Sequence, residues 1–140
     1  MNKIINFKNI KFFLFLIVIL LSNFNNAKEL LIYADSISYD ENENILARGN
    51  AKIFHNNKYI FSDLIIYKKL EKKILLPSKF IFKDEENNFY EGSKGYFIKD
   101  MDYAEFNNPK MLLNDGSRII GDKMKRDGHI DIISKGVYTP

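Results

Sequence analysis

The chain has 140 residues, enough for one domain, and its 21 Lys and Arg residues stand against 18 Asp and Glu residues. Residues 1–27 hold Lys3, Lys8 and Lys11 and no acid, so the rest of the chain carries equal numbers of cations and anions. This balance excludes the basic surface typical of nucleic-acid binding, and we expect no nucleic-acid partner. The absence of cysteine excludes disulfides and thiol chemistry.

The first segment, residues 1–27, is predicted to be a secretory signal peptide. Three lysines precede the apolar run FFLFLIVILL at residues 12–21, and SNFNNA then leads to Ala27 as the cleavage point. A helix that spans a bilayer needs ~20 apolar residues, and this run is shorter. A retained membrane anchor is the alternative. In both cases residues 28–140 leave the cytoplasm and form the one predicted domain.

A repeat with a period of roughly thirty residues follows. The phrases ADSISY, SDLIIY, SKGYFI and GDKMKR begin at Ala34, Ser62, Ser93 and Gly121. Fifteen residues after each start lies a residue that favours a bend or bulge in a strand. These residues are Gly49, Pro77, Asn108 and Gly136. Periods of this size indicate stacked supersecondary units.

Each unit is predicted to be a β-hairpin. Its first half alternates, its second half is again apolar, and polar segments such as DENEN at residues 40–44 join the two. The one helix candidate, residues 69–76, would be stopped by Pro77. The sequence therefore predicts about eight to ten strands, all antiparallel, wound as stacked hairpins into an open sandwich or jelly-roll-like stack.

The end strands of such a stack remain unpaired. An exposed strand edge is an aggregation hazard unless it is capped or joined to a strand of another chain. The fourth unit stops at VYTP, where the earlier units continue with NAKIF, SKFIF and PKMLL. We therefore expect the ends of the stack to pair with other strands.

No constellation of catalytic residues is recognisable in the sequence. The two histidines, His55 and His129, lie in polar turn segments and are expected to be exposed. The segment GSKG at residues 92–95 lacks the glycine spacing and the following helix of a phosphate loop. The aspartates near the unit starts recur in register, which fits a turn role better than acid–base chemistry. We expect no enzyme, no cofactor and no metal.

The strands carry more apolar residues than a half-buried sheet requires. In LLIYA, DLIIY and SKFIF, large side chains occupy both strand faces. One interpretation is a closed sandwich core, and the other is an open apolar interior that accepts a lipid. The pattern alone does not separate these two interpretations.

The first unit, ADSISYDENENILARGNAKI at residues 34–53, resembles the repeat that opens the OstA or LptA-like domain family. A phrase of the form A-D-x-I-x-Y-D followed by A-x-G-N-(A/V)-x-I is typical of that family. The later units match more loosely, and the resemblance covers residues 30–138. It implies a periplasmic, all-β fold, an open β-jellyroll or β-taco of stacked antiparallel hairpins. It also implies a lipopolysaccharide transport function, in which acyl chains lie in the apolar interior.

The end of the chain, ISKGVYTP, resembles the junction where the N-terminal domain of LptD-type proteins runs toward its barrel. We expect a domain of that type, with a free-standing LptA-like bridge protein as the alternative. The short apolar run argues against an LptC-like anchor. The implied partners are the lipid A part of lipopolysaccharide, other Lpt-type jellyroll domains added edge to edge, and the outer-membrane translocon. The implied location is the periplasm next to the outer membrane.

The unit alignment predicts which side chains face inward and bind the acyl chains. The ten predicted residues are Ile37, Tyr39, Ile53, Ile65, Tyr67, Ile81, Tyr96, Ile98, Leu112 and Met124. A shift of one residue in strand phase would turn several of them outward. The competing hypothesis is a secreted β-repeat scaffold that has a closed core and binds protein or glycan without lipid transport.

Overall fold

The computed structural model describes residues 29–140, so the predicted signal peptide at residues 1–27 lies outside the described residues. The described chain forms eleven strands and no helix. The strands are β1 (Leu31–Tyr33), β2 (Ser36–Tyr39), β3 (Ile45–His55), β4 (Lys58–Lys68), β5 (Lys73–Lys83), β6 (Phe89–Ile98), β7 (Tyr103–Leu112), β8 (Arg118–Ile120), β9 (Lys123–Asp127), β10 (Ile130–Ser134) and β11 (Val137–Thr139). All pair antiparallel in one sheet, so the predicted all-β fold of stacked hairpins is confirmed.

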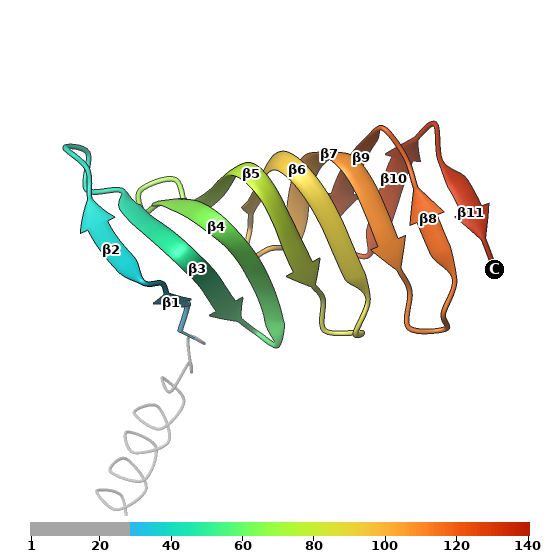
Figure 1. The fold of residues 1–140 in the computed structure, drawn as a ribbon, viewed down its shortest axis with the longest axis horizontal. Helices are drawn as coiled ribbons and strands as arrows, with labels where there is room; N and C mark the ends of the chain where they lie inside the picture. The colour runs from blue at the N-terminus through green and yellow to red at the C-terminus, as the bar shows by residue number, and fades with distance from the viewer. Residues whose placement is uncertain (1–28) are drawn as a thin grey trace, which may run out of the picture.

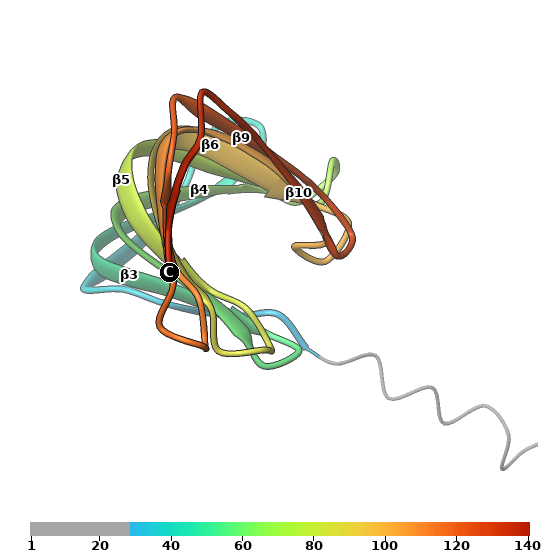
Figure 2. The same cartoon turned by 90° about the vertical axis from the view of Figure 1, so that its right-hand side faces the viewer.

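The sheet folds over on itself because the long strands β3–β7 bend near their middles. One half of each long strand pairs in a series that begins at β1 and ends at β8 and β11, which we call the lower wall. The other half pairs in a series from β2 to β9 and β10, which we call the upper wall. Figure 2 shows the two walls as the arms of a C in cross-section.

The bends coincide with β-bulges, where the register between neighbouring strands shifts. In β3 the shift contains Gly49 and Asn50, whose φ angles are 74° and 45°. The shift in β5 contains Pro77, and the shift in β7 contains Asn108 with a φ of 51°. The predicted bends at Gly49, Pro77 and Asn108 are thus confirmed. Gly136 instead lies in the link between β10 and β11, so the prediction of a bend within a strand is wrong there.

The core lies between the two walls. Ile53, Ile60, Phe82 and Tyr90 are paired in register across β3–β6, and each is at most 1% exposed. Such cross-strand ladders are the unit of sheet stabilisation. The ring of Phe82 in the lower wall lies with its centroid 4.7 Å from that of Phe97 in the upper wall. The walls are therefore in direct contact in the middle of the molecule.

Both ends of the stack carry strands with one unpaired edge among the described residues. These are β1 and β2 at one end and β10 and β11 at the other (Figure 1). Unpaired backbone donors and acceptors are therefore presented at each end of the long axis.

Candidate functional site

Six of the ten predicted site residues lie on the inner face of the sheet. Because residues directly opposite each other on neighbouring strands share a face, the pairs of Ile37 and Ile65 with the buried Ala47 place both inside. The six residues are Ile37, Tyr39, Ile53, Ile65, Tyr67 and Met124. Ile53, Ile65 and Met124 are buried, whereas Tyr39 on the end strand β2 is 71% exposed.

The predicted inward orientation is wrong for the other four residues, Ile81, Tyr96, Ile98 and Leu112. Ile81 lies between the buried Phe80 and Phe82, and Tyr96 and Ile98 flank the buried Phe97. Leu112 follows the buried Met111, and it is 44% exposed. Ile81, Tyr96 and Leu112 belong to the outer face; Ile98, the last residue of β6, is on that face by strand alternation but also lines the edge of the groove between the walls.

The four errors have two local causes. The segment that joins the inward-facing residues Tyr67 and Ile74 contains one residue more than the segment that joins the inward-facing residues Tyr39 and Ile45. The third unit also begins one residue earlier than the alignment had it, so that Phe97 faces inward. A shift of one residue turns every side chain of a strand segment to the other face.

His55 departs from its expected exposure. It ends β3 and is 6% exposed, with Nδ1 3.4 Å from the carbonyl oxygen of Glu29. Its Nε2 lies 2.9 Å from the side-chain nitrogen of Asn56 and 3.6 Å from the carboxylate of Asp100. The expectation of an exposed turn residue is therefore wrong for His55, whereas His129 is exposed.

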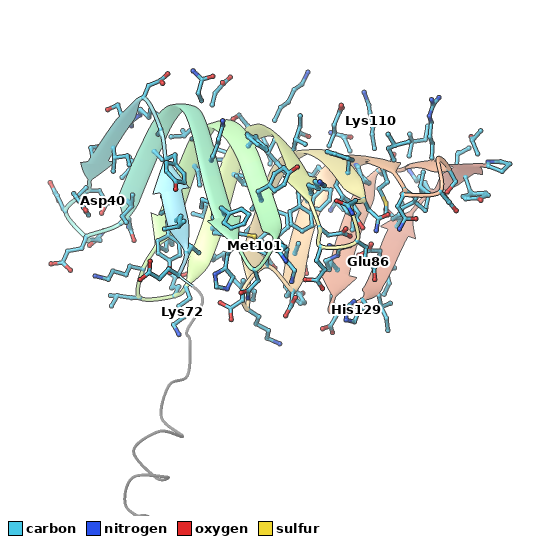
Figure 3. The ribbon with its side chains drawn as sticks, turned by 90° about the horizontal axis from the view of Figure 1, so that it is seen from below. Asp40, Lys72, Glu86, Met101, Lys110 and His129 are labelled. Atoms are coloured by element: carbon cyan, nitrogen blue, oxygen red, sulfur yellow. The ribbon has the colours of Figure 1, made fainter. Side chains whose placement is uncertain are left out.

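A groove opens between the walls, mainly in the half of the stack nearest β1 and β2. It has a volume of about 910 Å³ and a mixed lining: its floor carries the apolar residues Leu30, Tyr67, Ile74, Phe97, Ile98 and Met101, and most of its other lining residues, such as Lys58 and Asp102, are polar or charged. A second hollow of about 540 Å³ shares Leu30 and Tyr67 with it and extends to Tyr39. Figure 3 shows Met101 near the middle of the molecule, with Lys72 and His129 along the side on which the groove opens. Cavities of this size accommodate small molecules or parts of larger ligands.

Charged residues on the two walls meet across the mouth of this groove. Lys58, at the start of β4 in the lower wall, forms an ion pair with Asp102 in the turn between β6 and β7. The Lys58 Nζ is also 3.6 Å from a Glu85 carboxylate oxygen, and Lys58 is only 6% exposed. The Asp100 carboxylate approaches His55 across the same mouth. The groove therefore combines an apolar floor with a charged rim.

In the other half of the stack, a buried ionic cluster ties the walls together. The Arg126 guanidinium of β9 donates to both carboxylate oxygens of Asp131, at 2.8 and 2.9 Å. Its Nη2 also lies 3.3 Å from the carboxylate of Asp84, which follows β5 in the lower wall, and it contacts the Tyr90 hydroxyl. The guanidinium lies 4.6 Å from the ring centroid of Tyr90. This Arg126 cluster closes the mouth at the β9–β10 end.

The ionisation of the Arg126 cluster follows from its contacts. Burial alone would raise the pKa of Asp84, but hydrogen bonds from Asn88 and Tyr90 and the charge of Arg126 lower it below its ordinary value. Burial also raises the pKa of the Tyr90 hydroxyl. Asp84 is therefore an anion and Tyr90 a neutral donor at neutral pH, and the Tyr90 hydroxyl donates to Asp84 over 2.9 Å.

The groove places apolar side chains on its floor beside charged and polar groups at its rim. Within residues 29–140, no group of three or more His, Cys, Asp or Glu side chains is placed to hold a metal ion. Among the same residues, no helix has the length and apolar character needed to cross a bilayer. The chemistry that the groove itself offers is burial of hydrocarbon below a rim of charged groups.

No family model and no curated protein matches the chain in sequence. Among solved structures, the fold is similar to that of LptH from Pseudomonas aeruginosa, described as the LptA homologous periplasmic component of the conserved lipopolysaccharide transport device. The TM-score is 0.68, and the match covers 81% of this chain and 95% of that chain at 11% sequence identity. A likeness at this identity is one of fold, and it confirms the predicted open jellyroll architecture. It does not distinguish an LptA-like protein from an LptD-type domain.

Proposed function

We propose that the chain carries lipopolysaccharide in the periplasm by holding the acyl chains of lipid A in the groove between its walls. The observation that carries the proposal is the groove of about 910 Å³, with its apolar floor and charged rim, which lies inside a fold similar to that of LptH. Each buried methylene is worth ~0.8 kcal/mol, so a lipid with several acyl chains needs an apolar path through water. The transfer is non-covalent and requires no catalytic residue.

The acyl chains enter from the end that carries β1 and β2. Tyr39 and Ile37 are exposed on the inner face there, and Tyr67 links the two hollows of the groove. Ile53, Ile65 and Met124 lie deeper on the same inner face. Because Phe82 and Phe97 are in contact in the middle, acyl chains that pass further have to separate the walls.

The unpaired strand edges are the sites at which partner domains would bind. An edge strand accepts a strand of another Lpt-type jellyroll domain by backbone hydrogen bonding, which would extend the groove from one domain to the next. We favour an LptD-type domain that delivers the lipid to the outer-membrane translocon, with an LptA-like bridge protein as the alternative. The predicted signal peptide at residues 1–27 would direct the chain to the periplasm.

Site-specific photo-crosslinking in cells tests the proposal with pairs of neighbouring residues. A photo-reactive amino acid at Ile65 or Tyr67 should capture lipopolysaccharide, because both face the interior. The same group at Leu64 or Ile66 serves as the matched control, since each is one residue away on the opposite face of β4. Equal capture at both members of each pair, or capture at neither, would refute the groove hypothesis.

The scaffold hypothesis is favoured by one observation, the direct contact of the walls at Phe82 and Phe97. A sandwich that stays closed would bind a protein or a glycan on its surface and would take no lipid inside. Under this hypothesis, purified protein mixed with lipopolysaccharide shows no crosslink at Ile65 or Tyr67. It would also leave the fluorescence of an acyl-chain probe unchanged.

A further inference from the structure

The outer face of the lower wall carries two continuous rows of side chains that run across its eight strands. In the row nearer the turns, the apolar members are Leu31, Phe54, Tyr59, Phe89 and Leu112. In the row nearer the bend, they are Tyr33, Phe61, Ile81, Ile120 and Val137. We call these two rows, with the charged residues between their members, the outer lower face.

Apolar exposure is concentrated on this face. Of the fourteen large apolar residues that are exposed in the described chain, eight lie here, with exposed fractions between 38% and 56%. The outer side of an antiparallel sheet that faces water normally alternates to polar residues. A contiguous apolar surface of this kind marks an interaction site.

The charges on the same face are almost all positive. The two rows contain Lys52, Lys83, Lys110 and Arg118 and a single acid, Glu91. The Lys83 Nζ lies 5.3 Å from the ring centroids of both Tyr59 and Phe89, and the Lys52 Nζ lies 5.2 Å from that of Phe61. Lysine stems that cover aromatic rings while the ammonium group stays solvated are typical of membrane interfaces.

A hollow lies where this face meets the bend. It has a volume of about 580 Å³, and its lining includes the apolar Phe61 and Ile81, three lysines and two acids, namely Lys52, Lys79, Lys110, Asp63 and Glu91. The Lys110 Nζ lies 3.9 Å from a Glu91 carboxylate oxygen. Figure 3 shows Lys110 on the side of the molecule opposite Glu86 and His129, away from the mouth of the groove. The lysines outnumber the acids in the hollow, so it presents ammonium groups next to apolar side chains, an arrangement that suits a phosphate-bearing lipid headgroup.

We propose that the outer lower face binds the surface of a membrane that contains anionic phospholipids. Its aromatic and aliphatic side chains would enter the boundary between headgroups and acyl chains, and its four cations would attract the lipid phosphates. A second copy of the chain fits this face poorly, because two such faces would oppose four cations to four cations. The inference concerns the outside of the sheet and is independent of what the groove binds.

Vesicle flotation tests the proposal with the chain recovered after export. Phosphatidylcholine vesicles that contain phosphatidylglycerol should bind the protein, and pure phosphatidylcholine vesicles should bind it far more weakly. The triple variant K52Q/K83Q/K110Q should bind the anionic vesicles about a hundredfold more weakly, since each lysine near an anionic surface contributes a factor of roughly five. The matched control K69Q/K94Q/K123Q removes the same charge from the upper wall and its turns, and it should bind as the unchanged chain does.

A second variant tests the apolar part of the face. The double substitution Phe54→Ser and Phe89→Ser removes two half-exposed rings without a change in charge and should also weaken vesicle binding, with an unchanged circular dichroism spectrum. Equal binding by the K52Q/K83Q/K110Q variant and its control would overturn the proposal, as would the absence of binding to anionic vesicles. A dimer in ultracentrifugation that both face variants abolish would assign the face to a second copy instead.

Discussion

At the scale of single residues, Arg126 is the side chain on which the connection between the walls depends most. It is 6% exposed and has anionic partners in both walls, Asp131 beside it and Asp84 opposite. We expect Arg126→Met to lower the free energy of unfolding by about 3 kcal/mol, because the buried carboxylate of Asp84 and the partly buried one of Asp131 lose their cation while the packed stem is kept. Urea denaturation measures this loss. In the matched control Lys135→Met, the lost ion pair with Asp122 is exposed, and the cost should stay below about 1 kcal/mol. Equal costs in the two variants would show that the cluster does not hold the walls.

Asp84 adds a pH dependence at the same scale. Its pKa is lower in the folded state than in the unfolded chain, so its contribution to stability is fully present above the unfolded pKa. That contribution is lost as the pH falls through the folded value, so stability should decline below about pH 4. Urea midpoints at a series of pH values should fall more steeply in this acid range for the unchanged chain than for Asp84→Asn. Parallel curves would contradict the assignment.

At the scale of elements, the bulges determine how the sheet bends, and Gly49 in the β3 bulge combines a left-handed backbone with a close neighbour. Its φ is +74°, and a Cβ atom added there would lie 2.6 Å from the Asp35 carboxylate. Gly128 has a similar φ of +62°, but nothing lies near its Cβ position. We expect Gly49→Ala to cost about 1 kcal/mol or more beyond Gly128→Ala in thermal or urea denaturation, because only the first adds a steric clash to the backbone strain. Equal losses would mean that Asp35 moves aside freely.

The element scale also shows how far sequence reasoning reaches. The hairpins and the bends were predictable from local sequence, because the backbone preferences of Gly49, Pro77 and Asn108 each favour a bulge. The facing of Ile81 and Tyr96 was not predictable in the same way. It depends on a single residue more or less in a turn, and the apolar pattern on both sides of these strands conceals such a shift.

The sequence did not predict the Arg126 cluster, for a different reason. Arg126 and Asp84 are 42 residues apart, and they meet only because the sheet folds over on itself. Neither residue belongs to a motif, so no signal in the sequence distinguishes them from other charged residues of the strands. Contacts between the walls depend on the degree of curl, which no single repeat unit encodes.

At the scale of the whole molecule, the stack is unequal along its axis: the groove opens near β1 and β2, whereas the Arg126 cluster closes the other half. The central strands β4–β6 are paired along both edges, but β1, β2, β10 and β11 are paired along one. Amide hydrogen exchange should therefore be fastest in the four end strands and slowest in β4–β6. If the ends join by strand addition, raising the protein concentration should slow exchange in those four strands and leave β4–β6 unchanged. Hydrogen exchange measured by mass spectrometry over a series of protein concentrations tests this, and β4–β6 serve as the internal control. Exchange that is independent of concentration in the end strands would exclude self-association through these edges and leave them to a different partner domain.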